Sequence, residues 1–140
     1  SSQMDFDMKQ AAAKDNDNPV YYAQYAHSRM CSILKNKDIP AFHQEESYDR
    51  LTDEKELQLL KMMGEFPATV AKAAKMRKPN LIADYILALV KLYHSYYNVS
   101  RVNNPDDPEL TNQRLGLVKA LKVTLRNALD LLGVTAPESM

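Results

Sequence analysis

Residues 80–102 constrain the fold of this chain more than any other stretch. On a helical wheel of about 100° per residue, this stretch is apolar nearly all the way round. Its polar side chains fall in one narrow stripe, which is formed by Asp84, Lys91, Ser95 and Asn98. A helix with so little polar surface is stable only when neighbouring elements cover it on several sides. The sequence therefore predicts a central helix that is surrounded by other elements.

The neighbours are predicted to be helices as well. Asn18 and Pro19 form a helix start, because an asparagine caps the free backbone N–H groups and a proline fits the first helical position. The chain has only three glycines, and no alternating strand pattern stands out. The patterns predict helices at about 19–36, 53–63, 66–77, 80–102 and 109–132, with a loop at 37–51. We expect an all-α protein, a bundle of five to six helices.

The first of these helices has two different faces. Tyr22 and Ala23 lie on an apolar core stripe with Ala26, Met30, Ile33 and Leu34, and His27 lies on the same side as a structural histidine. Tyr21 and Tyr25 lie off that stripe, with Arg29 on the flank. Aromatic rings stack on unpaired bases and a guanidinium holds phosphate, so this face suits single-stranded nucleic acid. The alternative is that the tyrosines pack beneath another helix of the same domain.

Composition excludes several classes of function. There is no glycine-rich phosphate loop, and the three histidines lack the spacing of a zinc site. The single cysteine excludes an internal disulfide and fits a reducing cytosol, and no long apolar run predicts a membrane span. The 18 basic and 18 acidic residues cancel, whereas proteins that bind nucleic acid nonspecifically are usually basic. Any binding of RNA by this chain alone is therefore expected to be weak.

Four segments resemble, in the same order, the C-terminal anticodon-binding domain of bacterial arginyl-tRNA synthetases. Residues 18–29, Asn-Pro-Val-Tyr-Tyr-Ala-Gln-Tyr-Ala-His-Ser-Arg, resemble the opening of that domain. Residues 4–8, Met-Asp-Phe-Asp-Met, resemble the segment that precedes it. Residues 81–102 are similar to its central helix, and residues 125–140 are similar to its terminal signature, which ends on methionine. The resemblance covers nearly the whole chain.

The resemblance implies a fold and a role. Residues 18–140 would form the anticodon-binding helical bundle of a class I synthetase, and residues 1–17 would end the segment that links it to an upstream catalytic domain. The full-length enzyme would join arginine to its tRNA with ATP and magnesium in the cytoplasm. This chain lacks the His-Ile-Gly-His-like and Lys-Met-Ser-Lys-Ser-like motifs of class I synthetases, so we expect it to be inactive alone and to hold no cofactor.

The same resemblance points to individual residues. By motif, the anticodon loop of an arginine-accepting tRNA would contact the first long helix, the end of the central helix and the terminal methionine. The RNA-binding residues that we predict are Tyr21, Tyr25, Arg29, Tyr97, Asn98 and Met140. The other expected partner is the enzyme's own catalytic domain, and we expect a monomer without membrane contact.

Two other classes of function stay open on the sequence. Tyrosine and arginine also form protein interfaces, so the chain could be a helical protein–protein interaction module. The exposed tyrosines could also serve only to cover an adjoining catalytic domain.

Overall fold

The fold is known from a computed structural model, which describes residues 18–99 and 101–140. This part of the chain contains five helices and no strand, which confirms the predicted all-α bundle. The predicted linking segment, residues 1–17, lies outside the described residues. The helices are α2 (Pro19–Lys35), α3 (Glu54–Gly64), α4 (Phe66–Met76), α5 (Asn80–Val99) and α6 (Pro108–Leu131).

The helix starts follow from the capping residues that the sequence offers. The side chain of Asn18 accepts hydrogen bonds from the backbone N–H groups of Val20 and Tyr21, at 3.0 and 3.3 Å. Asp53 and Glu56 form a capping box at the start of α3. The side chain of Asp53 accepts a hydrogen bond from the backbone N–H of Glu56, and the side chain of Glu56 accepts one from the backbone N–H of Asp53. Such local hydrogen bonds fix where a helix begins before any tertiary contact is made.

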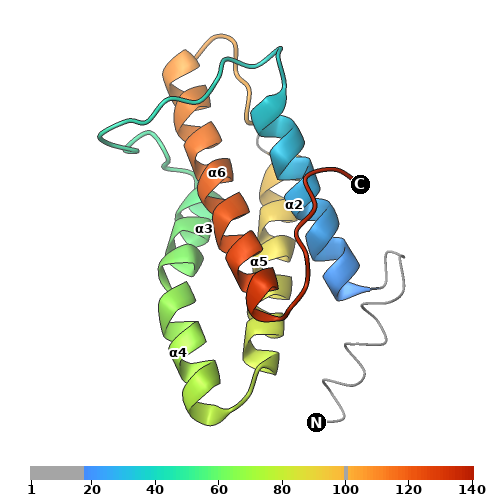
Figure 1. The fold of residues 1–140 in the computed structure, drawn as a ribbon. Helices are drawn as coiled ribbons and strands as arrows, with labels where there is room; N and C mark the ends of the chain where they lie inside the picture. The colour runs from blue at the N-terminus through green and yellow to red at the C-terminus, as the bar shows by residue number, and fades with distance from the viewer. Residues whose placement is uncertain (1–17, 100) are drawn as a thin grey trace.

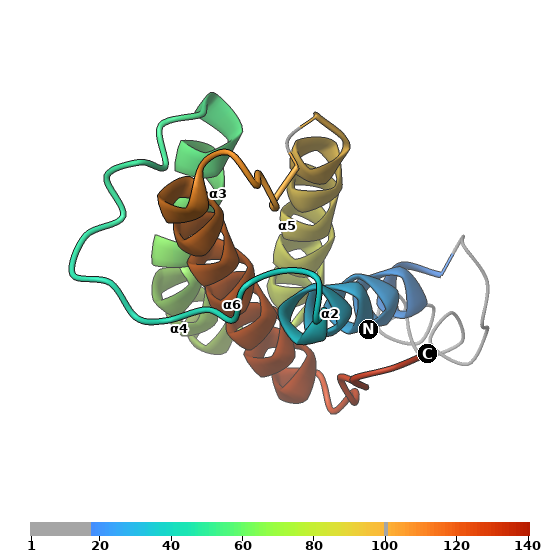
Figure 2. The same cartoon turned by 90° about the horizontal axis from the view of Figure 1, so that it is seen from above.

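The helix α5 is the central element of the bundle, as its apolar wheel predicts. It packs against all four other helices of the described chain. Figure 1 shows α3 and α4 following one another down one side, while α6 and α2 lie on the other sides of α5. Seen from above in Figure 2, α2 lies on the far side of the bundle from α3 and α4. Because α2 and α5 are direct neighbours, the residues that they expose can form one surface.

The end of α5 differs from the prediction. The helix ends at Val99, whereas the wheel predicts helix to about residue 102. Val102 is nevertheless buried, because the connection to α6 turns it into the core. Apolar spacing reports burial, and a buried residue in a turn satisfies the same pattern as a buried residue in a helix.

The long connection between α2 and α3 lies against the first half of α6. Two buried amides of α6 hold its backbone: Asn112 accepts from the N–H of His43 at 3.0 Å, and Gln113 accepts from the N–H of Arg50 at 2.8 Å. Phe42 and Tyr48 pack over Gly116, where a β-carbon would come within 3 Å of both rings. The connection thereby covers the first half of α6.

Candidate functional site

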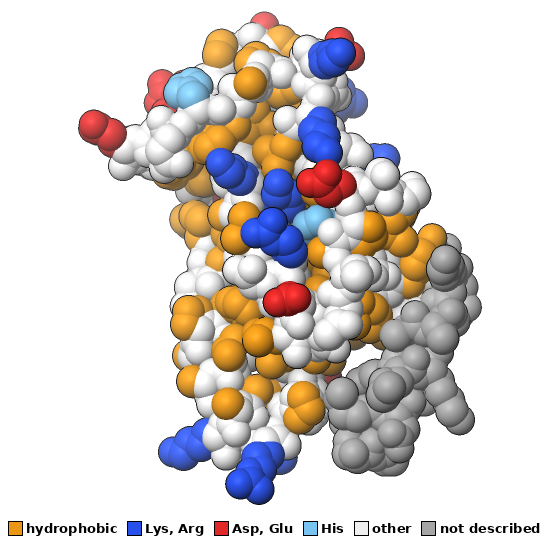
Figure 3. Space-filling view, viewed as in Figure 1, with side chains coloured by type: hydrophobic (Ala, Val, Ile, Leu, Met, Phe, Trp, Pro, Cys, Tyr) orange, Lys and Arg blue, Asp and Glu red, His pale blue; other side chains and the backbone are white. Residues whose placement is uncertain are grey.

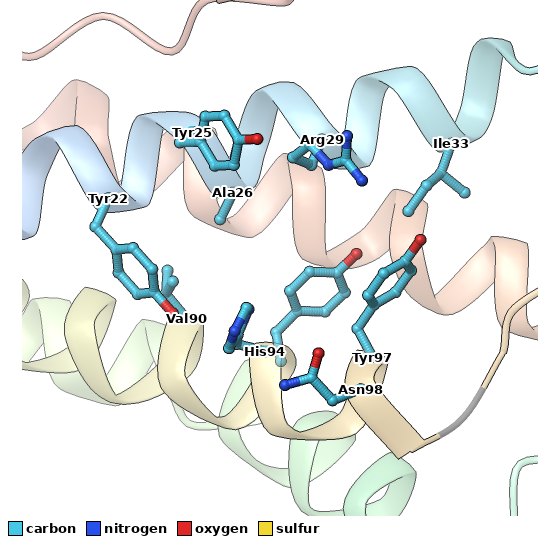
Figure 4. A pocket seen from close by; sticks show the side chains of 10 residues that line it. Tyr22, Tyr25, Ala26, Arg29, Ile33, Val90, His94, Tyr97 and Asn98 are labelled. Carbon is cyan, nitrogen blue, oxygen red and sulfur yellow. The ribbon is translucent and has the colours of Figure 1, made fainter. Parts of the chain in front are cut away.

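A groove runs between α2 and α5. It has a volume of about 360 Å³ and is lined by side chains from both helices. From α2 it receives Tyr22, Tyr25, Ala26, Arg29 and Ile33, and from α5 it receives Val90, Tyr93, His94, Tyr97 and Asn98. We call this feature the α2–α5 groove. Figure 4 shows Arg29 and Tyr97 extending toward one another from the two helices that form it.

The structure brings together four of the six residues that the sequence singles out. Tyr25, Arg29, Tyr97 and Asn98 all line the α2–α5 groove and are all exposed. Tyr25 is 46% exposed, so the alternative in which another helix covers this ring is wrong. Two adjacent tyrosines at the end of α5 differ in burial: Tyr96 is fully buried in the core, whereas Tyr97 reaches the surface.

The other two predicted residues do not line the groove. Tyr21 is half-buried on α2, one turn before Tyr25. Met140 is half exposed at the end of the segment that follows α6. Their assigned contacts with RNA remain predictions.

Six of the ten groove residues are absent from the prediction, and three of these six, Tyr22, Tyr93 and His94, carry aromatic rings. Tyr22 is assigned to the core stripe by the wheel, yet its ring lies edge-on to that of His94, with 6.1 Å between the ring centroids. Tyr93 lies one turn before Tyr97, and their ring centroids are 6.0 Å apart. The spacing of Tyr93 and Tyr97 repeats that of Tyr21 and Tyr25, and this repeat is a signal that sequence analysis could have used.

A second, more polar hollow adjoins the groove. It has a volume of about 440 Å³ and shares Ile33, Tyr97 and Asn98 with the α2–α5 groove. Its other lining residues are Asn36, Asp38, Ile39, Arg101, Val102 and Asn103. Tyr97 and Asn98 therefore stand between an aromatic compartment and a polar one.

The segment after α6 lies along α2, on the side away from the groove. Gln24 donates to the backbone oxygen of Thr135 at 2.8 Å, and Lys35 forms an exposed ion pair with Glu138 at 3.0 Å. Figure 1 shows this segment turning back beside α2. The segment is thereby docked on α2 as far as Glu138, whose backbone oxygen accepts from Ser28 at 3.4 Å. The ridge of α2 that carries Tyr25 is thus bordered by the groove on one side and by this tail on the other.

His27 lies beneath the tail, residues 132–140, and contacts its backbone. It is buried, as the wheel predicts, and its Nδ1 lies 3.0 Å from the carbonyl oxygen of Pro137. Because a carbonyl only accepts, Nδ1 donates, and Nε2 has no hydrogen-bond partner among the described residues. Burial lowers the pKa of His27 below its ordinary value of 6.5, although the Pro137 carbonyl acts in the opposite direction. The folded domain therefore favours neutral His27.

Acidification is expected to lower the free energy of unfolding of this domain. A group whose pKa is lowered by folding takes up its proton more readily when the domain unfolds. Its contribution to stability is therefore present above its ordinary pKa and is lost as the pH falls below about 6.5. The pKa of Glu138 is also lowered, because Lys35 donates to it, and this acts in the same direction at more acidic pH. The free energy of unfolding, measured by urea denaturation, should fall between about pH 7.5 and 5.5.

The variant His27→Asn tests this assignment. Its side-chain amide can still donate to Pro137 but does not titrate, so the acid-dependent loss of stability that His27 causes should disappear above about pH 5.5. His94→Asn, at an exposed position, serves as the matched control and should keep it. An equal pH dependence in the parent chain and in His27→Asn would contradict this account.

The chemistry that the groove offers is recognition rather than bond making. It presents aromatic rings, one guanidinium and one amide. Among the described residues, no group of three or more histidine, cysteine or acidic side chains is arranged to hold a metal ion. No helix in this part of the chain is long and apolar enough to span a membrane.

Basic side chains gather on the face that carries α6 and the docked tail. Figure 3 shows lysines and arginines along the middle of this face, over α6 and the upper part of α2. Lys122 and Arg126 are among the α6 residues whose charges lower the pKa of His27, so they lie near the docked tail. A chain with no net charge thus carries a local basic face, on the side of α2 where the tail docks.

Comparisons with known proteins agree with this geometry. The family model described as the DALR anticodon binding domain matches residues 23–140. The arginine–tRNA ligase 2 of Bacillus thuringiensis subsp. konkukian and the arginine–tRNA ligase of Bacillus cereus are each 50% identical over 99% of this chain. The chain spans about a quarter of the length of these curated relatives, 25% in both cases.

Solved structures give the same result. The arginyl-tRNA synthetase of Thermus thermophilus superposes with a TM-score of 0.72 and 34% identity, covering 91% of this chain and 22% of that one. A putative arginyl-tRNA synthetase of Campylobacter jejuni shares the fold, with a TM-score of 0.75 at 23% identity over 94% of this chain and 29% of its own. The family resemblance that the four motifs indicate is confirmed, and the chain belongs to the family of DALR anticodon-binding domains.

Proposed function

We propose that this chain binds the anticodon loop of an arginine-accepting tRNA, as the anticodon-binding part of an arginine–tRNA ligase. The observation that carries the proposal is the α2–α5 groove, in which Tyr25, Arg29, Tyr97 and Asn98 converge from two helices. A recognised loop presents unstacked bases, which stack on tyrosine rings and offer their edges to amides. The match to anticodon-binding domains supports the same role.

The parts of the groove have different tasks in this proposal. The exposed rings of Tyr25 and Tyr97 stack on bases that are turned out of the loop, and stacking tolerates every base. Arg29 holds a phosphate, which positions the loop without reading its sequence. Asn98 reads a base edge through its amide. Tyr21 on α2 and Met140 at the end of the segment that follows α6 extend the contact surface beyond the groove.

The remaining steps belong to the full-length protein. An upstream catalytic domain would bind ATP with magnesium and join arginine to the tRNA, whereas this chain alone supplies binding and no catalysis. We place the enzyme in the cytoplasm and expect a monomer. The zero net charge of this part means that the catalytic domain contributes most of the phosphate contacts.

A titration of the 140-residue chain tests the proposal. The probe is an RNA hairpin that carries the anticodon loop of an arginine-accepting tRNA, and the readout is backbone NMR shifts, which detect weak binding. The matched control has the same stem and a different anticodon. We expect shifts centred on the α2–α5 groove with the first hairpin and weaker binding of the second.

Two outcomes would contradict the proposal. Equal affinity for both hairpins would show that the chain does not read the anticodon. Absence of binding to either hairpin would favour the alternative of a protein–protein interface, in which the same tyrosines cover another domain.

A further inference from the structure

One buried tyrosine differs from the others in its hydrogen bonding. Tyr85 donates to the backbone oxygen of Met62 at 2.6 Å, and Tyr96 donates to a carboxylate oxygen of Glu56 at 2.7 Å. Tyr93 is 5% exposed, and its hydroxyl has no hydrogen-bond partner among the described residues. A buried hydroxyl without a partner destabilises the fold, so such a group calls for a specific explanation.

The position of this hydroxyl gives that explanation. Tyr93 lines the α2–α5 groove, together with the four exposed residues that the sequence predicts for RNA contact. The charge of Arg29 and the hydroxyl of Tyr97 both act on the titration of Tyr93, so both side chains lie close to it. Burial raises the pKa of Tyr93, which keeps the hydroxyl protonated and able both to donate and to accept.

We propose that Tyr93 is a specificity-determining residue, whose hydroxyl hydrogen-bonds the polar edge of an anticodon base inserted into the α2–α5 groove. This inference rests on the proposed function. The exposed rings hold any base by stacking, whereas a fixed hydroxyl at the base of the groove favours a base that presents a matching donor or acceptor. In the complex, the RNA base would supply the hydrogen-bond partner that the Tyr93 hydroxyl lacks among the described residues.

The side chains over Tyr93 can make way for such a base. Arg29 and Tyr97 are both exposed, so both can change rotamer without disturbing the core. The ring of Tyr97 is tilted by 31° from that of Tyr93. Movement of these two side chains would expose the Tyr93 hydroxyl to a base in the groove, while the Tyr93 ring stays fixed by the helices around it.

The variant Tyr93→Phe separates this role from a structural one. It keeps the ring and removes only the hydroxyl, so we expect a melting temperature equal to or above that of the parent chain. Binding of the cognate hairpin should weaken roughly tenfold, which is the order of one hydrogen bond of this kind. The matched control Tyr96→Phe removes a hydroxyl that has a partner, and should lower the melting temperature without changing which base is preferred.

A cycle of protein and RNA variants identifies the base. Hairpins in which each anticodon base is replaced in turn are titrated against the parent chain and against Tyr93→Phe. For one of the three bases, we expect replacement to leave the affinity of Tyr93→Phe unchanged, because the hydrogen bond from the Tyr93 hydroxyl to that base is already lost. Replacement of the other bases should weaken binding of the variant as it does binding of the parent chain.

Three results would overturn the inference. Unchanged affinity of Tyr93→Phe, or a loss that is equal for every hairpin, would show that the hydroxyl reads no base. A melting temperature lowered as in Tyr96→Phe would show that the hydroxyl already has a partner within the chain. If the parent chain itself fails to distinguish anticodons, the proposed function fails first, and this inference fails with it.

Discussion

Replacing Glu56 with alanine is expected to lower the free energy of unfolding by about 3–5 kcal/mol, the usual range for breaking a buried ion pair. Glu56 is 1% exposed and lies in the first turn of α3. One of its carboxylate oxygens accepts from Tyr96 at 2.7 Å and from Nε of Arg114 at 2.8 Å. The other accepts from the backbone N–H of Asp53 at 3.1 Å.

The size of the effect comes from the groups that lose their partner. Alanine would leave the Arg114 guanidinium without its carboxylate, the buried Tyr96 hydroxyl without its acceptor, and one N–H at the start of α3 without its cap. The Arg114 side chain is 16% exposed, and an unpaired charge in such a partly buried position is more destabilising than the loss of a hydrogen bond between neutral groups. The network also joins α3, α5 and α6, so its loss weakens the centre of the bundle.

Urea unfolding of the 140-residue chain, followed by circular dichroism, measures this effect. Glu54→Ala, at an exposed position in the same turn, is the matched control and should change stability by less than about 1 kcal/mol. Tyr96→Phe should fall between the two, since it removes one hydrogen bond. A Glu56→Ala chain that unfolds within about 1 kcal/mol of the parent would show that this network contributes little.

Replacing Tyr25 with alanine is expected to weaken binding of the cognate anticodon hairpin by about 10- to 100-fold, because stacking of one base on an aromatic ring contributes about 1–3 kcal/mol. Tyr25 lies on the exposed ridge of α2 and contributes little to the core. The thermal stability of the chain should therefore stay close to that of the parent. The NMR titration that tests the proposed function measures the change.

Two control variants test whether the loss of binding comes from the ring of Tyr25. Tyr25→Phe keeps the ring, so it should bind the hairpin almost as the parent does. Leu57→Ala removes an exposed apolar side chain on α3, which contributes nothing to the groove, and should leave binding unchanged. If Tyr25→Phe were as defective as Tyr25→Ala, the hydroxyl rather than the ring plane would be the functional group.

Helix boundaries could largely be predicted from the sequence because they rest on local interactions. Asn18 with Pro19, and Asp53 with Glu56, satisfy helix ends within a few residues of themselves. Gly133 adopts a positive φ of 73° just after α6, the conformation that glycine takes most readily. The predicted end of α5 was wrong because Val102 is buried by a turn, which local spacing cannot distinguish from a helix.

The candidate site could be predicted only in part. Tyr25 and Arg29 were found because a wheel separates the buried and exposed faces of one helix. Tyr93 was missed because its ring belongs to the core while its hydroxyl faces the groove. The same sequence pattern describes Tyr93 and Tyr96, and only their surroundings distinguish them: Tyr96 meets Glu56, and Tyr93 meets no acceptor among the described residues.

By itself, the sequence determined that this chain forms helices, that α5 is their centre, and that Tyr21 and Tyr25 lie off the apolar stripe of α2. These properties follow from the period of apolar residues and from capping groups that act over one turn. Only the tertiary structure decided that α2 and α5 lie side by side, that their tyrosines share one groove, and that the tail docks against His27. Contacts between residues far apart in the chain depend on how the helices pack, and no local pattern encodes that packing.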